Sequence, residues 1–360
     1  MANKLPYNIY FESSWNSFGD RLNELSLPHH RICIVTDCNV ASFYLEDVRN
    51  CLKDTGAEIY DYILPAGEEY KTLEQIQGIY TYLVENHFDR QDLLIALGGG
   101  VVGDMTGYAA ATYLRGIDFV QVPTTLLSQV DSSIGGKTGV DFACYKNLVG
   151  AFKQPRMVYM NMSVLKTLSD RQFASGMAEV IKHGCIRNVA YLAYLRDNKE
   201  ALFARDLTVL THVVSESLKI KRKIVETDPY EKGERALLNF GHTLGHALEK
   251  ETCFSLTHGE GVSLGCAAAL YLSHKRGYLS KEECQQTEHL FQEYSLPIRM
   301  RTMQAEAVLE AVKHDKKMDG TSIRFILLEN LGHAVIDRNV SVSELNDALY
   351  YLLEDKHHEY

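Results

Sequence analysis

Short apolar runs alternate with amphipathic stretches in the first half of the chain. Four of these runs, at 31–36, 58–64, 93–97 and 119–122, are typical of buried strands. Stretches between them, such as 72–86, carry apolar residues at helical spacing. Short strands that alternate with helices predict a parallel, doubly wound sheet, which binds ligands at the carboxyl ends of its strands.

The second half of the chain has a different pattern, because strand-like runs become scarce and long helical patterns dominate. We expect helices at 170–187, 189–202, 206–225, 234–250, 259–276, 281–294 and 303–314. A late β-like run at 323–328 is expected to form a minor hairpin with 334–336. The pattern predicts an α/β domain over 1–167 and, that hairpin apart, an all-α domain over 168–360.

Composition and charge narrow the class of protein. Hydrophobic residues make up 46% and charged residues 23% of the chain, as in globular proteins. No apolar run reaches the length of a membrane span, and the first residues lack the apolar segment that is typical of a secretory signal. A net charge of −10 disfavours nucleic acid and anionic membranes as partners. We therefore expect a cytoplasmic protein with reduced cysteines, in which clustered cations bind anionic ligands.

A glycine-rich turn follows the expected strand at 93–97. Gly98, Gly100 and Gly103 form a GxGxxG pattern, in which backbone N–H groups at a helix N-terminus can bind a pyrophosphate. The motif alone is weak, because any tight strand-to-helix turn favours glycine. Phosphate binding and a purely structural turn both stay open. Asp37, at the end of the first expected strand, is the candidate that binds a ribose hydroxyl.

A second segment of small residues, at 132–139, contains Lys137 and is followed by Lys146 and Asn147. It is not a P-loop, because Ser132 stands where the first glycine is required. Two interpretations fit this pattern. The segment either closes over an anion or is a turn with a solvated lysine.

The helical half carries a sharper signal. Arg235, Asn239, His242 and His246 follow one another at spacings of four, three and four, so on one helix they would share a face. Two histidines and one carboxylate would form an open catalytic zinc site. Spacing alone suggests that His242 and His246 chelate one ion.

The candidate carboxylate for this metal is Glu179, which stands in an otherwise apolar helical pattern with Lys182 one turn away. A nucleotide-binding half, a divalent metal and a group of cations indicate oxidation of a metal-held alcohol on an anionic substrate. The metal would lower the pKa of the hydroxyl group, and a nicotinamide would accept the hydride.

Taken together, these segments resemble the 3-dehydroquinate synthases, a family of sugar phosphate cyclases. The resemblance covers nearly the whole chain, and the combination of its motifs is highly specific. The matching segments are GGGVVGD at 98–104, YLRG at 113–116, VPTTLLSQVDSSIGGKTGVD at 122–141, KN at 146–147, GMAEVIKHG at 176–184, LLNFGHTLGHALE at 237–249, HGEGV at 258–262 and DKK at 315–317.

The resemblance implies a Rossmann-like NAD-binding domain, a helical metal-binding domain and a homodimer. It implies that Glu179, His242 and His258 bind a divalent metal, zinc or else cobalt. The implied NAD contacts are Asp37, Asn39, Glu68, Lys71, Gly99, Gly100, Asp104, Thr124, Thr125, Asp131, Lys137, Lys146 and Thr167.

The implied substrate is a phosphorylated sugar acid. Its contacts would be Arg115 (from the neighbouring subunit), Lys137, Lys146, Asn147, Lys221, Arg235, Asn239, His246 and one of Lys316 and Lys317, with Lys316 favoured. The implied catalytic residues are Asp131, Lys137, Lys182, Glu231, Asn239 and His246. In this resemblance His246 contacts substrate and is not a metal ligand.

The implied reaction is a lyase step of the shikimate pathway to chorismate and the aromatic amino acids. It converts 3-deoxy-D-arabino-heptulosonate 7-phosphate to 3-dehydroquinate and phosphate by transient oxidation with NAD, elimination, reduction and aldol closure. Three alternatives stay open: another sugar phosphate cyclase, a metal-dependent polyol dehydrogenase of the glycerol dehydrogenase type, and a catalytically silent NAD-binding regulator.

Overall fold

The computed structural model describes residues 5–25, 30–143, 145–231, 233–314, 318–319 and 322–353. The chain divides into two compact units. Lys4–Leu168 is named the α/β unit here, and Ser169–Tyr360 the helical unit. None of the helices in the described part of the chain is long and apolar enough to span a membrane.

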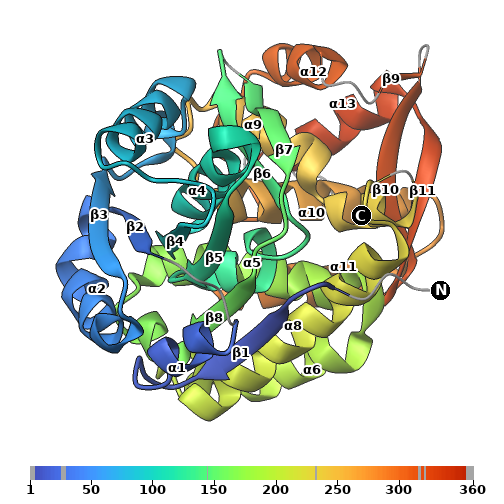
Figure 1. Cartoon of the computed structure of the whole chain (residues 1–360). Helices are drawn as coiled ribbons and strands as arrows, with labels where there is room; N and C mark the ends of the chain where they lie inside the picture. The colour runs from blue at the N-terminus through green and yellow to red at the C-terminus, as the bar shows by residue number, and fades with distance from the viewer. Residues whose placement is uncertain are drawn as a thin grey trace. The chain divides into compact units, whose positions relative to one another are not determined.

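The α/β unit is built on a parallel sheet of six strands in the order β1-β8-β5-β4-β2-β3 (Figure 1). The expected parallel sheet and its four expected strands are confirmed, whereas β1 and β8 were missed. The edge strand β1 is only partly buried, and both strands are only five residues long. The strands are β1 (Asn8–Glu12), β2 (Arg31–Asp37), β3 (Glu58–Leu64), β4 (Leu93–Gly98), β5 (Asp118–Pro123) and β8 (Met157–Asn161).

Helices cover both faces of this sheet. Successive side chains of each strand point to opposite faces, so a continuous apolar strand has apolar side chains on both faces that must be buried. On β2, Ile32 and Ile34 join the core formed with α1 and α2, while Cys33 and Val35 join the core formed with α3 and α4. The sheet is therefore doubly wound, as its apolar strands predict. The helices are α1 (Phe18–Asn23), α2 (Cys38–Cys51), α3 (Leu73–Glu85) and α4 (Gly100–Thr112).

An antiparallel hairpin, β6 (Lys137–Phe142) and β7 (Tyr145–Phe152), was not expected from the sequence. The small-residue segment at 132–139 therefore ends in a strand and is not wholly a loop. Val140 of β6 is buried in the core that contains α4, and this contact anchors the hairpin.

The helical unit contains α5 (Asp170–Arg187), α6 (Val189–Asp197), α7 (Lys199–Phe203), α8 (Leu207–Thr227), α9 (His242–Glu251), α10 (His258–Lys275), α11 (Lys281–Glu293), α12 (Ala305–His314) and α13 (Val342–Tyr351). It also holds an antiparallel sheet of β9 (Met318–Asp319), β10 (Ser322–Asn330) and β11 (His333–Val340). The expected hairpin is confirmed, so "all-α" is too coarse a description of this unit. The expected helix at 189–202 is two helices, which meet at Asn198.

The expected single helix at 234–250 is wrong. Its first part is a 3-10 helix, η6 (Glu234–Asn239), and α9 begins only after Gly241, whose φ of 80° is left-handed. Arg235 and Asn239 therefore do not share a helix face with His242 and His246. Glycine adopts this backbone conformation without the steric cost that other residues meet.

Helices α9 and α10 touch through their backbones. A Cβ atom on Gly265 would lie 1.8 Å from the carbonyl oxygen of Gly241, and one on Gly245 would lie 2.8 Å from that of Gly261. No side chain fits at Gly265, so the two helices can approach more closely than helices with larger contact residues.

We expect Gly265→Ala to lower the free energy of unfolding by about 2–3 kcal/mol, because the added methyl group forces α9 and α10 apart. Gln286→Ala is the control, because it places alanine at an exposed position of α11 and adds no atom to a helix contact. Urea denaturation followed by circular dichroism measures both. Equal stability of the two variants would show that the helix contact is not tight.

Candidate active site

The order of strands places a topological switch point between β2 and β4. The chain passes from β2 to β3 on one side and then returns to β4 on the other side of β2. Doubly wound sheets bind ligands in the crevice at this point, outside the carboxyl ends of the strands. Asp37 ends β2, and the glycine-rich turn begins at Gly98, the last residue of β4.

The turn has the strand–turn–helix context that phosphate binding requires. Gly99 precedes α4, and a Cβ on Gly100 would lie 3.0 Å from Oγ of Ser132. The backbone N–H of Thr124 donates to the carbonyl of Gly98 at 2.9 Å, and the buried Thr124 hydroxyl has no hydrogen-bond partner among the described residues. The open donors of the helix N-terminus and this hydroxyl are groups that can bind a phosphate.

Two other implied NAD contacts have structural partners. Asp37 Oδ1 accepts hydrogen bonds from the backbone N–H groups of Asn39 at 2.9 Å and Val40 at 3.0 Å, so it caps α2. The Thr167 hydroxyl contacts that of Tyr44 and donates to a backbone carbonyl. The sequence analysis assigned Asp37 a ligand role alone and missed its role as a helix cap.

Lys71 is the centre of a polar network at the same end of the α/β unit. Lys71 is 4% exposed, and its ammonium group donates to Oδ2 of Asp104 at 2.7 Å and to Oδ1 of Asn147 at 2.5 Å. Burial lowers the pKa of Lys71, but Asp104 and Glu68 outweigh it and raise the net pKa above its usual range. Burial raises the pKa of Asp104, against the opposing effect of Lys71.

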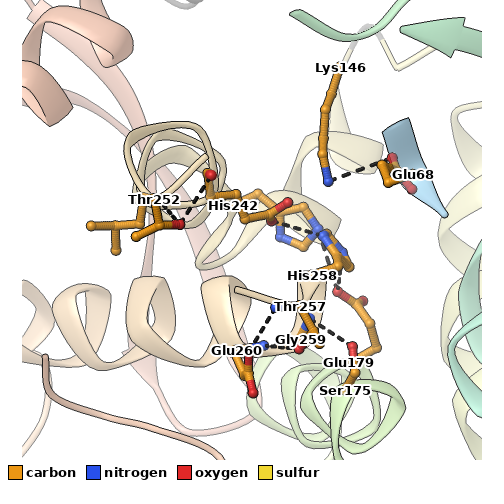
Figure 2. A network of polar contacts seen from close by, with 12 residues as sticks. Glu68, Lys146, Ser175, Glu179, His242, Thr252, Thr257, His258, Gly259 and Glu260 are labelled. Carbon is orange, nitrogen blue, oxygen red and sulfur yellow. Dashed lines mark hydrogen bonds and ion pairs between the residues drawn. The ribbon is translucent and has the colours of Figure 1, made fainter. Parts of the chain in front are cut away.

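This network ties the segment around Lys71 to the β6–β7 hairpin. The backbone N–H of Asp141 donates to the Lys71 carbonyl at 2.8 Å, and Asp141 Oδ1 accepts from the Asn147 N–H at 2.7 Å. Nζ of Lys146 lies 3.6 Å from Oε1 of Glu68, an ion pair drawn in Figure 2. Implied NAD and substrate residues are thus in direct contact within one unit.

Arg115 lies in a strained corner after α4. Leu114, Arg115 and Gly116 have φ values of 50°, 69° and 126°. Left-handed conformations cost about 1–3 kcal/mol each for residues other than glycine, and such strain clusters at functional sites. Arg115 is exposed, and Nε of Arg90 donates to the Leu114 carbonyl at 2.9 Å.

In the helical unit, a buried carboxylate and two imidazoles converge. Glu179 comes from the middle of α5, while His242 and His258 are the first residues of α9 and α10. Glu179 Oε1 lies 3.5 Å from Nε2 of each histidine, as Figure 2 shows. Tetrahedral zinc with ligand bonds of about 2.0–2.2 Å separates its ligand atoms by about 3.4 Å, so the set fits such an ion.

The protonation states of Glu179 and His242 suit metal ligands. Burial would raise the pKa of Glu179, but Lys182, His242 and His258 hold it well below its usual range, so it is a carboxylate. Burial and the nearby Lys182 ammonium keep the pKa of His242 well below its usual range, so it is neutral. Nδ1 of His242 lies 3.1 Å from the carbonyl of Phe240, which leaves the lone pair on Nε2.

His258 lies between two carboxylates. Its Nδ1 is 3.1 Å from Oε1 of Glu249, and its Nε2 faces Glu179. Burial lowers the pKa of His258, but Glu249 and Glu179 together raise it to about 10. The sequence analysis missed Glu249, although it follows His246 by three residues and so lies on the same face of α9.

The structure also places the other predicted residues of the helical unit. Lys182 is buried and forms an ion pair with Glu179 one turn away. The Asn239 amide donates to Oε1 of Glu231 at 2.7 Å, and the His246 ring is 5.2 Å from the His242 ring. Lys221 and Arg235 are both buried. Lys316 and Lys317 lie outside the described residues.

Within the α/β unit, the remaining predicted residues come from several different elements. Asp131 belongs to a short π-helical turn, η4 (Ser128–Ser132), and Lys137 is an exposed residue that begins β6. Asn39 is exposed, and Glu68 is half-buried. The Thr125 hydroxyl donates to Oγ of Ser128 at 2.9 Å.

The α/β unit is a doubly wound sheet with a glycine-rich turn at its switch point, and the helical unit that follows holds the group of Glu179, His242 and His258. These features define a class of Rossmann-like proteins with a helical C-terminal half. Residues 61–175 match the family model "3-dehydroquinate synthase N-terminal", and 176–318 match "3-dehydroquinate synthase C-terminal". The chain belongs to the 3-dehydroquinate synthase family.

Curated relatives agree with this assignment. The chain is 41% identical over 321 residues to 3-dehydroquinate synthase of Acetivibrio thermocellus, with 89% of each chain covered. It is 45% identical over 325 residues to that of Shewanella piezotolerans, with 90% of each covered. Among solved structures, 2-epi-5-epi-valiolone synthase from Streptomyces hygroscopicus, with NAD+ and Zn2+ bound, is 25% identical at a TM-score of 0.90, with 97% of each chain covered. The expected fold class is confirmed.

We expect Lys71→Met to lower the free energy of unfolding by about 3 kcal/mol at pH 7, because it leaves the Asp104 carboxylate largely buried without its ammonium partner. The interaction with Lys71 stabilises only the ionised form of Asp104, so the loss should shrink as the pH falls from neutral to acidic values, through the raised pKa of Asp104.

Urea denaturation of both proteins across this pH range measures the effect. Lys53→Met, at an exposed lysine of the same unit, is the control and should cost little at any pH. A stability loss for Lys71→Met that is the same at every pH would contradict the buried ion pair.

Proposed function

We propose that the chain catalyses the 3-dehydroquinate synthase reaction, a carbon–oxygen lyase step that releases phosphate from 3-deoxy-D-arabino-heptulosonate 7-phosphate. The observation that carries this proposal is the match of both family models over 61–318, with relatives at 41% and 45% identity over about nine-tenths of the chain. Identity to the valiolone synthase, which has the same fold, is only 25%. This difference favours the dehydroquinate reaction over that of another cyclase.

In this proposal, residues 1–167 form the NAD-binding domain and residues 168–360 the metal- and substrate-binding domain. The switch point with Asp37 and the turn at Gly99 and Gly100 supports NAD binding, because the crevice and the helix N-terminus fit a dinucleotide pyrophosphate. The remaining proposed NAD contacts are Asn39, Glu68, Lys71, Asp104, Thr124, Thr125, Asp131, Lys137, Lys146 and Thr167.

Glu179, His242 and His258 would hold a divalent metal, most simply zinc, with cobalt as a substitute. Three protein ligands of N and O type leave a coordination position for substrate. When bound, such a metal polarises the substrate oxygen at the carbon that is oxidised and lowers the pKa of its hydroxyl group. The converging 3.5 Å contacts between Glu179 and the two imidazoles support this assignment.

The chain's own residues would mainly bind and orient the substrate. Cationic Lys221 and Arg235 would bind its carboxylate, and Lys137, Lys146, Asn147 and Lys316 its phosphate. Asn239 and His246 would hydrogen-bond the part of the substrate that reacts. The amide of Asn239 donates to Glu231, which holds it in place. Lys182 next to Glu179, together with Asp131, would complete the site. Oxidation, loss of phosphate, reduction and aldol closure need fixed charges and proton carriers rather than a protein nucleophile.

We expect the protein, supplied with zinc, NAD and the heptulosonate phosphate, to release phosphate without net accumulation of NADH. Phosphate is measured colorimetrically and NADH by its absorbance. His258→Ala is the control and should be inactive, since it removes a proposed metal ligand. NADH formed in amounts equal to product would instead support the polyol dehydrogenase alternative. If neither phosphate nor NADH is formed, the result would support the silent regulator.

Metal content separates the roles of the three histidines. We expect His242→Ala and His258→Ala to purify with little metal, because each loses one ligand of a three-ligand site, whereas His246→Ala keeps its metal and loses turnover. Elemental analysis of the purified variants decides this. A metal-poor His246→Ala beside a metal-replete His258→Ala would show that the His242–His246 helix pair is the chelate.

The protein would be a cytoplasmic homodimer in which Arg115 reaches the partner's site, a role supported by its strained, exposed corner. We expect a mixture of Arg115→Ala and Lys137→Ala chains to regain activity, because a mixed dimer would hold one site without either substitution. Activity is measured after the two inactive variants are mixed and refolded together. A mixture as inactive as its parents would contradict the shared site.

A further inference from the structure

We propose that Glu249 is a positioning residue for His258. Its carboxylate accepts a hydrogen bond from the Nδ1–H group of the imidazole and thereby aims Nε2 at the point that Glu179 and His242 also face. This inference rests on the metal site of the proposed function. It adds a residue that neither the motif spacing nor the resemblance assigned to the site.

The contact itself is short and shielded from water. Glu249 Oε1 lies 3.1 Å from Nδ1 of His258, and the Glu249 side chain is 1% exposed. A buried carboxylate is costly unless it is paired with a hydrogen-bond donor or a charge. The ring N–H of His258 provides such a partner.

The backbone of His258 is held by contacts that do not involve Glu249. The N–H of Gly259 donates to Oγ of Ser175 at 2.9 Å, and a Cβ on Gly259 would lie 2.2 Å from the carbonyl oxygen of Ser175 (Figure 2). Ser175 stands one helical turn before Glu179 on α5. The start of α10 is thus packed directly against the helix that carries Glu179.

A second set of contacts closes the first turn of α10. Thr257 and Glu260 form a capping box, and Arg171 donates to both carboxylate oxygens of Glu260, at 2.9 Å and 2.7 Å. With the main chain fixed in this way, the rotation of the His258 ring decides where its Nε2 points. Glu249 contacts the ring at the opposite nitrogen, where it can set that rotation.

The two proposed ligand imidazoles are held in the same manner. Nδ1 of His242 faces the carbonyl of Phe240, Nδ1 of His258 faces Glu249, and both Nε2 atoms face Glu179 at equal distance. A hydrogen bond at the second ring nitrogen fixes the tautomer of a ligand histidine and raises its basicity, and loss of such a partner weakens metal binding about 10–100-fold.

One competing arrangement uses Glu249 as a ligand. Glu249, His246 and His258 also lie close enough to hold an ion. We favour the positioning role, because a distance of 3.1 Å between Oε1 and Nδ1 suits a direct hydrogen bond, whereas the 3.5 Å contacts of Glu179 match the ligand spacing around an ion.

The test compares the full-length protein with its Glu249→Ala, Glu249→Gln and Glu288→Gln variants. Glu288 is the matched control, because it is also a buried carboxylate of the helical unit but is held by Arg299 and Tyr351. Zinc affinity is measured by competition with a chromophoric chelator, and the ligand set by the visible spectrum of the cobalt form. Unfolding of the metal-free proteins gives their stabilities.

We expect Glu249→Ala to weaken zinc binding about 10–100-fold and Glu249→Gln less than about tenfold, since the amide oxygen of glutamine can still accept a hydrogen bond from the Nδ1–H group. Both should keep the cobalt spectrum of the wild type. Glu288→Gln should lose stability without a change in zinc affinity.

Two results would overturn the inference while the metal site stands. If Glu249→Ala binds zinc as tightly as Glu288→Gln, Glu249 has only a structural role. If glutamine is as harmful as alanine and the cobalt spectrum changes, Glu249 is itself a ligand. A wild-type protein that binds no zinc would overturn the metal site of the proposed function and this inference with it.

Discussion

The backbone contact between α9 and α10 is the constraint on which the helical unit depends. His242 and His258 begin two different helices, and their rings can face one carboxylate oxygen only because the helices touch at Gly241 and Gly265. The contact of Gly259 with Ser175 then places the start of α10 against α5. Two close approaches at glycine residues thus bring three separate segments to one point.

Much of the fold follows from local patterns in the sequence. The central strands of the parallel sheet are continuous apolar runs, and the helix predicted at 170–187 has the bounds of α5. Helical spacing failed at 234–250, because a regular pattern of polar residues does not reveal a left-handed glycine between them. Gly241 separates η6 from α9, so the side chains meet through tertiary packing and not along one helix.

The candidate site shows the same limit. The i, i+4 spacing of His242 and His246 suggested a shared chelate, whereas the resemblance indicated His258, and only the structure shows His242 and His258 facing Glu179 alike. Glu249 could have been noticed from its spacing to His246, but its contact with His258 depends on the α9–α10 approach. Sequence spacing describes one element at a time, while a site of this kind is built from several.

The network around Lys71 has a consequence for how two ligands affect each other. Lys71, in the segment implied to contact the cofactor, donates to Asn147 on the hairpin implied to contact the substrate. A ligand that binds the Lys71 ammonium or the Asn147 side chain competes with the hydrogen bond between them, and so changes the free energy of the residue that it does not contact. Thermodynamic linkage then requires reciprocity. If the first ligand changes the affinity for the second by some factor, the second changes the affinity for the first by the same factor. If cofactor and substrate bind at the proposed residues, the hydrogen bond between Lys71 and Asn147 would therefore couple their affinities.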